Sequence, residues 1–176
     1  MEEQYVNPPS VGKVAFKWGL ITGLIMIVYS LVINMMGQFG NQALGAVSYV
    51  FIIFGIIMAH KEYKDSGDGY MSYGKGLGIG TLTTLIAAVL SAIFSYIYMT
   101  MIDPTVMDMI RDQQISDMEG RGMSDAQIEQ AMSMTESFMS PGFISFIAVF
   151  IITLVGFILS LIITAFTKNS NPELEM

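Results

Sequence analysis

Residues 18–59 read WGLITGLIMIVYSLVINMMGQFGNQALGAVSYVFIIFGIIMA and contain no Asp, Glu, Lys, Arg or His. A helix needs about 20 residues to cross the hydrocarbon core of a bilayer, so this run is long enough for two crossings. The turn between them lies at 36–42 (MGQFGNQ), where two glycines and three amides interrupt the apolar run. We therefore predict a first span at 18–36 and a second at 44–59.

Two further uncharged runs, at 76–102 and 143–167, predict a third and a fourth span. Tyr96 and Tyr98, near the end of the third, are expected to anchor it at the membrane surface, as amphipathic rings do. The four runs are apolar on all sides, whereas helices of a soluble bundle keep a polar face. Only 13% of the residues are charged, about half the usual fraction of a soluble domain. We therefore predict an all-α integral membrane protein in which residues 1–176 form a single membrane domain.

Lysine and arginine are divided unequally between the two sides of the predicted bundle. One side holds the segment 60–75, both chain ends and six lysines: Lys13, Lys17, Lys61, Lys64, Lys75 and Lys168. The other side holds Arg111 and Arg121, within a loop, 103–142, that also carries eight acidic residues. Because lysine and arginine are retained in the cytoplasm, we predict cytoplasmic N- and C-termini and an outer loop at 103–142. The first span is too long for the apolar core of a signal peptide, so we expect an uncleaved anchor.

The outer loop carries the signals of two helices. Asp103 followed by proline has the residue types of an N-cap and a first helical position, which predicts a helix over 104–119. Ser124 and Gln127 are spaced as a capping box, which predicts a second helix over 125–139. Between spans three and four we therefore expect a helical hairpin.

The second helix of this hairpin has an apolar face that must be covered. Its members recur at spacings of three and four: Ile128, Ala131, Met132, Thr135 and Met139. One covering is the first helix, through Val106, Met107, Ile110 and Met118. The other is a protein partner. Lipid is disfavoured, because the loop is acidic and helices that lie on anionic lipid are rich in lysine and arginine.

Residues suited to chemistry are scarce in this chain. There is no cysteine and one histidine, His60, which excludes thiolate catalysis and sites built from several histidines. The four predicted spans contain no Asp, Glu, Lys, Arg or His, whereas ion-coupled carriers place such residues there. We therefore expect no enzyme, no cofactor, and no catalytic, cofactor-binding or metal-binding residues. The acidity of the chain also argues against a nucleic-acid partner.

Methionine pairs and small residues recur, and packing explains both. Met-x-Met pairs, which suit Cu(I), occur at 99–101, 107–109 and 132–134. The two members of such a pair lie on different faces of a helix, so we expect them to act as apolar packing residues. Small residues recur four apart in the spans, where they let helices approach closely. They are Gly19 and Gly23; Gly55 and Ala59; Gly76 and Gly80; Ala87, Ser91 and Ser95; and Gly156, Ser160 and Thr164.

Several motifs together resemble one family of bacterial membrane proteins. They are KWGLITGL at 17–24, YMSYGKG at 70–76, FSYIY at 94–98 with Ile-Asp-Pro at 102–104, SPGFIS at 140–145, and Gly156 with Ser160. The set is similar to the domain-of-unknown-function 4199 family, and the resemblance covers residues 12–168. It implies four spans in a bacterial inner membrane. It implies no activity and no functional residues, because the family is uncharacterised.

Two functions are compatible with these expectations. The first is a non-enzymatic structural or protein-interaction role of the outer acidic hairpin, through self-association or contact with another envelope protein. The second is a small transporter or channel, not coupled to ions, with a path between the spans. In either case we expect a multi-pass protein of the bacterial inner membrane, in contact with the lipid bilayer.

Overall fold

The computed structural model describes residues 9–38 and 40–169, and this part of the chain is helical, without a β-strand. Four of its helices are long and apolar enough to cross a membrane. They are α1 (Val11–Met35), α2 (Gln42–Asp65), α3 (Tyr73–Ile97) and α6 (Pro141–Thr167). The predicted all-α fold with four transmembrane helices is therefore confirmed. Phe39, in the predicted turn, lies outside the described residues.

All four helices begin before the uncharged segments that predicted them, and α1 and α2 extend furthest beyond theirs. α1 starts at Val11 and so includes Lys13 and Lys17, and α2 continues past Ala59 to Asp65. Lysine and glutamate are good helix formers, so a helix does not stop where its apolar segment ends. The hydropathy of the sequence marks the part of each helix suited to lipid, and the hydrogen-bonded helix is longer.

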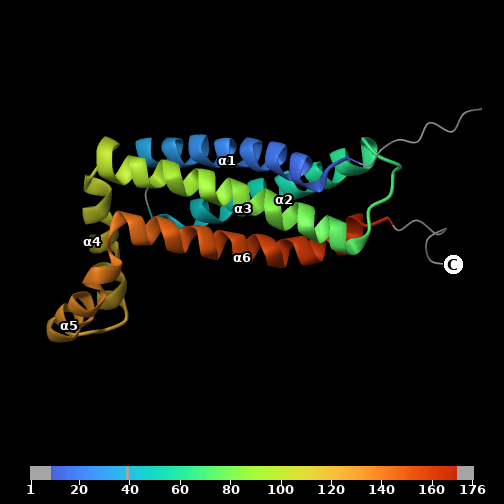
Figure 1. Cartoon of the computed structure of the whole chain (residues 1–176). Coiled ribbons are helices and arrows are strands. Elements are labelled where there is room, and N and C mark those ends of the chain that lie inside the picture. The colour runs from blue at the N-terminus through green and yellow to red at the C-terminus, as the bar shows by residue number, and fades with distance from the viewer. Residues whose placement is uncertain (1–8, 39, 170–176) are drawn as a thin grey trace, which may run out of the picture.

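α3 lies at the centre of the bundle, between α1 and α6 (Figure 1). Its most extensive contacts are with these two helices, and α2 contacts all three of the others. The end of the bundle with the α2–α3 turn carries the six lysines, and we call it the lysine end. The opposite end carries the insertion between α3 and α6, and we call it the hairpin end (Figure 1).

α3 and α6 pack through a series of contacts in which a glycine of one helix faces a hydroxyl residue of the other. Three such contacts follow one another along the two antiparallel helices: Gly76 with Thr164, Gly80 with Ser160, and Thr84 with Gly156. A methyl group added at Gly80 would lie 3.0 Å from the Ser160 Cβ, and one added at Gly156 would lie 2.5 Å from the Thr84 Cβ. The two backbones therefore approach as closely as residues without large side chains allow.

Close packing, rather than hydrogen bonding, holds this contact series together. Among the described residues the buried hydroxyls of Ser160 and Thr164 have no hydrogen-bond partner. The Thr84 hydroxyl donates within its own helix, to the Gly80 carbonyl at 3.0 Å. In lipid, apolar surface gains little by leaving its surroundings, so van der Waals contact is the main force that joins helices.

α1 uses its own small residues against α3 and α2. A methyl group at Gly19 would lie 2.6 Å from the Ile86 Cβ, and one at Gly23 would lie 3.2 Å from the Ala87 Cα. Gly55 of α2 lies against Thr22 of α1 in the same way. The prediction that the small residues serve packing between the spans is confirmed at these positions.

The large apolar side chains point away from the bundle. On α6 the buried residues are small: Ser145, Gly156, Ser160 and Thr164. The exposed residues are large and apolar, and they include Phe146, Phe150, Leu154, Ile158, Ile162 and Phe166. Phe146 is 71% exposed and Phe166 is 86% exposed. A water-soluble protein buries such side chains, so this arrangement suits lipid as the surrounding solvent.

At the lysine end, polar contacts tie the helices together. His60 is fully buried, and its Nε2–H donates to the Gly76 carbonyl at 2.8 Å, while Nδ1 lies 2.8 Å from the Thr167 hydroxyl. Glu62 accepts hydrogen bonds from Lys17 (2.7 Å) and from the Trp18 indole (2.8 Å). The single histidine therefore joins α2 to α3 and α6 as a structural residue.

A helical hairpin follows α3, as the sequence predicts. The chain leaves α3 through a π-helical turn, Tyr98–Ile102, and enters α4 (Thr105–Gly120) and α5 (Asp125–Thr135). Figure 1 shows that α4 crosses the end of the bundle toward the start of α6 and that α5 projects beyond it. Ile128 and Met132 of α5 are buried, and they share a groove with Ile115 of α4. The apolar face of the second helix is thus covered by the first.

The predicted capping box of α5 is present, whereas the predicted cap of α4 is shifted by one residue. Pro104, not Asp103, is the N-cap residue of α4, and the Asp103 carboxylate accepts from the Thr105 N–H at 3.2 Å. In the capping box of α5, the Ser124 N–H donates to the Gln127 Oε1 at 2.9 Å. Each cap supplies a partner for backbone groups that a helix end leaves unpaired.

The prediction that α5 continues to Met139 is wrong. The helix ends at Thr135, and a 3₁₀ turn, Glu136–Phe138, follows it. The residue before a proline disfavours the helical conformation, and Ser140, which precedes Pro141, is extended with φ −81° and ψ 145°. Ser140 therefore lies outside a helix, and a tighter 3₁₀ turn occupies part of the length that the sequence predicts for α5.

We predict that Gly80→Leu destabilises the bundle, because the added side chain meets Ser160 and Ile56 where the backbones are closest. Overpacking of this kind costs about 1–3 kcal/mol, and thermal unfolding of the detergent-solubilised protein, followed by circular dichroism, measures the loss. Gly78→Leu, two positions away, is the matched control, since a methyl group there meets nothing within 4 Å. Equal unfolding temperatures for the two variants would contradict the prediction.

Candidate ligand site at the hairpin end

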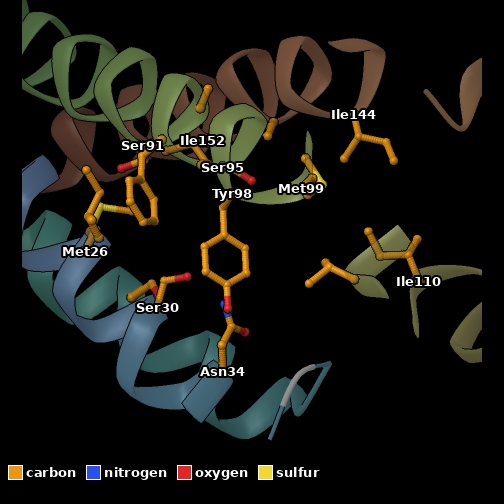
Figure 2. Close-up of a pocket in the computed structure, with 16 residues that line it drawn as sticks. Met26, Ser30, Asn34, Ser91, Ser95, Tyr98, Met99, Ile110, Ile144 and Ile152 are labelled. Carbon is orange, nitrogen blue, oxygen red and sulfur yellow. The ribbon is translucent and has the colours of Figure 1, made fainter. Parts of the chain in front are cut away.

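A cavity of about 310 Å³ lies where the bundle meets the hairpin. α1, α2, α3, the π-helical turn, α4 and α6 all contribute to its wall. We call it the hairpin-end cavity (Figure 2). Its volume is within the range of small-molecule pockets, which begins at about 300 Å³.

One part of the wall is polar and carries no charge. Ser30 and Asn34 come from α1, Ser48 from α2, and Ser91 and Ser95 from α3. In Figure 2, Ser30 and Asn34 lie on the α1 side, across from Ser91 and Ser95. The hydroxyl oxygen of Ser91 is buried and has no hydrogen-bond partner among the described residues. The other polar side chains of this wall, at Ser30, Asn34, Ser48 and Ser95, can offer hydrogen bonds to a molecule in the cavity.

The rest of the wall is apolar. It is formed by Met26, Ile27, Ala92, Phe94, Met99, Val106, Ile110, Ile144, Ala148 and Ile152. No Asp, Glu, Lys, Arg or His is among the residues that line the cavity. A charged ligand would lose its hydration there without gaining a counter-charge, so the cavity suits an uncharged molecule.

The π-helical turn brings Tyr98 and Met99 into the wall. Five successive residues, Tyr98–Ile102, form this turn, and it changes the direction of the side chains relative to a regular helix. Tyr98 then points across the cavity toward Asn34, while Met99 is 4% exposed on the α4 side (Figure 2). Tyr98, which the sequence predicts as an anchor of the span, thus contributes to the cavity wall, whereas Tyr96 is 47% exposed. Turns of this kind are frequent at functional sites.

α4 forms the roof of the cavity. Val106 is 4% exposed, and Val106 and Ile110 face the bundle, not α5 as the sequence suggested. Met107 and Ile115 lie on the other side of α4, against α5. Residues three or four apart share a helix face, so α4 has one face for the cavity and another for the hairpin.

A second hollow adjoins the cavity. This turn groove, also about 310 Å³, lies between the ends of α1 and α2 and includes the amides Gln38, Asn41 and Gln42. Ser30, Asn34 and Ser48 line both hollows. The cavity therefore adjoins the groove across a wall of small polar residues.

Toward the lysine end the bundle is closed. Ile52 and Ile56 of α2, Ile79 of α3 and Ala87 of α3 are each at most 1% exposed. Together with the glycine contacts of α3, these side chains fill the interior below the cavity. The cavity therefore does not continue toward the lysine end.

The sequence alone predicts no site residues, and it does not indicate that these side chains line a cavity. Ser91 and Ser95 were expected to continue the close-packed face of Ala87, but in the structure only Ala87 is fully buried in a helix contact. The available signal was the four-residue spacing of polar residues in two spans, Ser30 with Asn34 and Ser91 with Ser95. That spacing does not reveal which helices face each other.

The described residues contain no group of three or more His, Cys, Asp or Glu that is placed to hold a metal ion. The Met-x-Met pairs divide between two environments, as their helical spacing predicts. Met132 is 8% exposed and Met134 71%, and Met99 is 4% exposed and Met101 79%. The two members of a pair therefore do not meet.

Comparison with known proteins places the chain in a family. Neither a curated protein nor a solved structure matches the sequence. A family model does match, over residues 17–169, which cover α2, α3, α6, the hairpin, the residues that line the cavity and all but the first six residues of α1. The chain therefore belongs to the family described as protein of unknown function (DUF4199).

Proposed function

We propose that this chain is a non-enzymatic, multi-pass protein of the bacterial inner membrane that binds a small uncharged amphipathic molecule in the hairpin-end cavity. The observation that carries the proposal is the division of the cavity wall. Ser30, Asn34 and Ser95 can bond a hydroxyl or carbonyl group, and the side chains of α4 and α6 can cover an apolar body.

Filling the cavity tests ligand binding. Ala148→Phe adds a ring inside the cavity and should abolish retention of a bound molecule by the protein purified from its membrane. Native mass spectrometry measures the bound mass directly. Ile151→Phe is the matched control, because Ile151 lies on the same helix and is 52% exposed. A wild-type protein that carries no adduct, or an adduct that both variants retain, would contradict the proposal.

The hairpin-end cavity also supports the second candidate function, a small carrier or channel that is not coupled to ions. The adjoining turn groove supports entry of a solute from the hairpin end, and the closed lysine end requires the helices to move before a solute leaves. Uptake of uncharged solutes into proteoliposomes separates transport from binding. Uptake at the level of empty vesicles, together with a bound adduct, favours binding alone.

The orientation is part of the proposal. The six lysines are gathered at one end of the bundle, and Arg111 and Arg121 lie in the acidic hairpin at the other. By the positive-inside rule the lysine end is cytoplasmic, with both termini, and the hairpin is outside.

Single cysteines test this orientation, since the natural chain has none. Ser133→Cys, in the hairpin, should react with a membrane-impermeant maleimide in intact cells. Asp65→Cys, at the lysine end, should react only after the membrane is opened, although both positions are exposed. The reverse pattern of labelling would show that the protein has the opposite orientation.

The hairpin supports an additional interaction role, with a basic protein on the outer side as the partner. Met134 and Phe138 are 71% and 55% exposed, so both offer apolar surface to a partner. The hairpin carries eight acidic residues and two arginines, so a second copy would be repelled and a basic surface attracted.

A photo-crosslinking residue at Met134 tests this interaction. It should capture one defined protein in native membranes, whereas the same residue at Phe150, which is 64% exposed on α6, should capture none. Glu129→Lys should reduce the capture at Met134, because it removes charge from the exposed side of α5. Capture that is equal at both sites, or that Glu129→Lys leaves unchanged, would contradict a charge-directed partner.

A further inference from the structure

We propose that the hairpin holds a binding site for a soft monovalent metal ion such as Cu(I), formed by the thioethers of Met107, Met132 and Met139. These residues come from α4, from α5 and from the residue that follows the 3₁₀ turn, and they line one groove of about 180 Å³. The site lies on a different face of α4 from the hairpin-end cavity, and it goes beyond the proposed function.

The structure assembles this group from residues that the sequence keeps apart. Each of the pairs 107–109 and 132–134 contributes one methionine to the groove, while Met109 is 46% exposed and Met134 is 71% exposed. The early end of α5 sends the chain back so that Met139 joins the same groove. The methionine spacing in the sequence therefore points to the wrong pairs, and the fold selects one member of each.

The remaining groups of the groove suit a cation of low charge. Asp108 and Glu136 line it with Arg111, so two carboxylates outweigh one guanidinium. Thioethers are neutral and soft, and they select Cu(I) over hard divalent ions. A ligand set without cysteine or histidine also needs no deprotonation before it binds metal.

Packing alone explains this arrangement less well. Methionine fills apolar interiors, but this groove is small, partly open and lined by three charged residues. Met132 is 8% exposed, so its sulfur is held in place, whereas Met107 and Met139 are half-buried at the opening. Leucine would fill the same space, so exchange of methionine for leucine separates the two explanations.

The test uses the full-length protein in detergent micelles, with Cu(I) kept reduced and in competition with a coloured Cu(I) chelator. Wild-type protein should take one equivalent. The variant M107L/M132L/M139L should bind at least about 10- to 100-fold more weakly, the loss expected when the surroundings of a bound metal are disturbed. M109L/M134L removes exposed methionines from the same hairpin and should bind as the wild type does.

A second measurement keeps the proposal testable if the triple variant fails to fold. Wild-type protein labelled at its methionine methyl carbons is titrated with Ag(I), a diamagnetic substitute for Cu(I). The methyl signals of Met107, Met132 and Met139 should shift together, and those of Met109 and Met134 should stay. Absence of binding by the wild type, equal loss in M109L/M134L, or shifts confined to other methionines would each overturn the proposal.

Discussion

The close approach of α3 to α6, glycine against hydroxyl residue, is the constraint on which the rest of the structure depends. In lipid, helices do not associate to hide apolar surface, so they need contact between backbones. Gly76 and Gly80 on one helix and Gly156 on the other provide it, and the spacing of four keeps all three contacts on one face of each helix. With α3 held in this way, α1 packs on it through Gly19 and Gly23.

The hairpin-end cavity begins where the close glycine contacts of α3 end. Beyond Ala87 the α3 face continues with Ser91 and Ser95, and no glycine of α1 or α6 lies opposite them. The π-helical turn then redirects Tyr98 inward, and α4 closes the space with Val106. The helices are therefore closely packed toward the lysine end. At the hairpin end they are further apart, and polar side chains such as Ser91 and Ser95 line the space between them.

Local signals explain why the helices and caps were predictable from the sequence and the site was not. An uncharged run, a Ser-x-x-Gln box or an Asp-Pro pair acts through neighbours in the chain, and each appears in the structure near its predicted place. The cavity depends on how the helices are rotated about their axes and on a π-helical turn, and neither leaves a periodic pattern. The groove of Met107, Met132 and Met139 depends on the early end of α5, at Thr135, whereas the apolar spacing of the sequence predicts a helix to Met139.

α4 lies between the hairpin-end cavity and the groove of Met107, Met132 and Met139, and it contributes residues to both. Val106 and Ile110 cover the cavity, while Met107 and Arg111, each one position further along the helix, line the methionine groove. A helix moves as a unit, so a ligand that orders one face of α4 also fixes the other. Two ligands that both prefer the same position of α4 must favour each other's binding, by the reciprocity of linked equilibria. The connections on both sides of α4 are short: the π-helical turn, Tyr98–Ile102, precedes it, and residues 121–124 join it to α5.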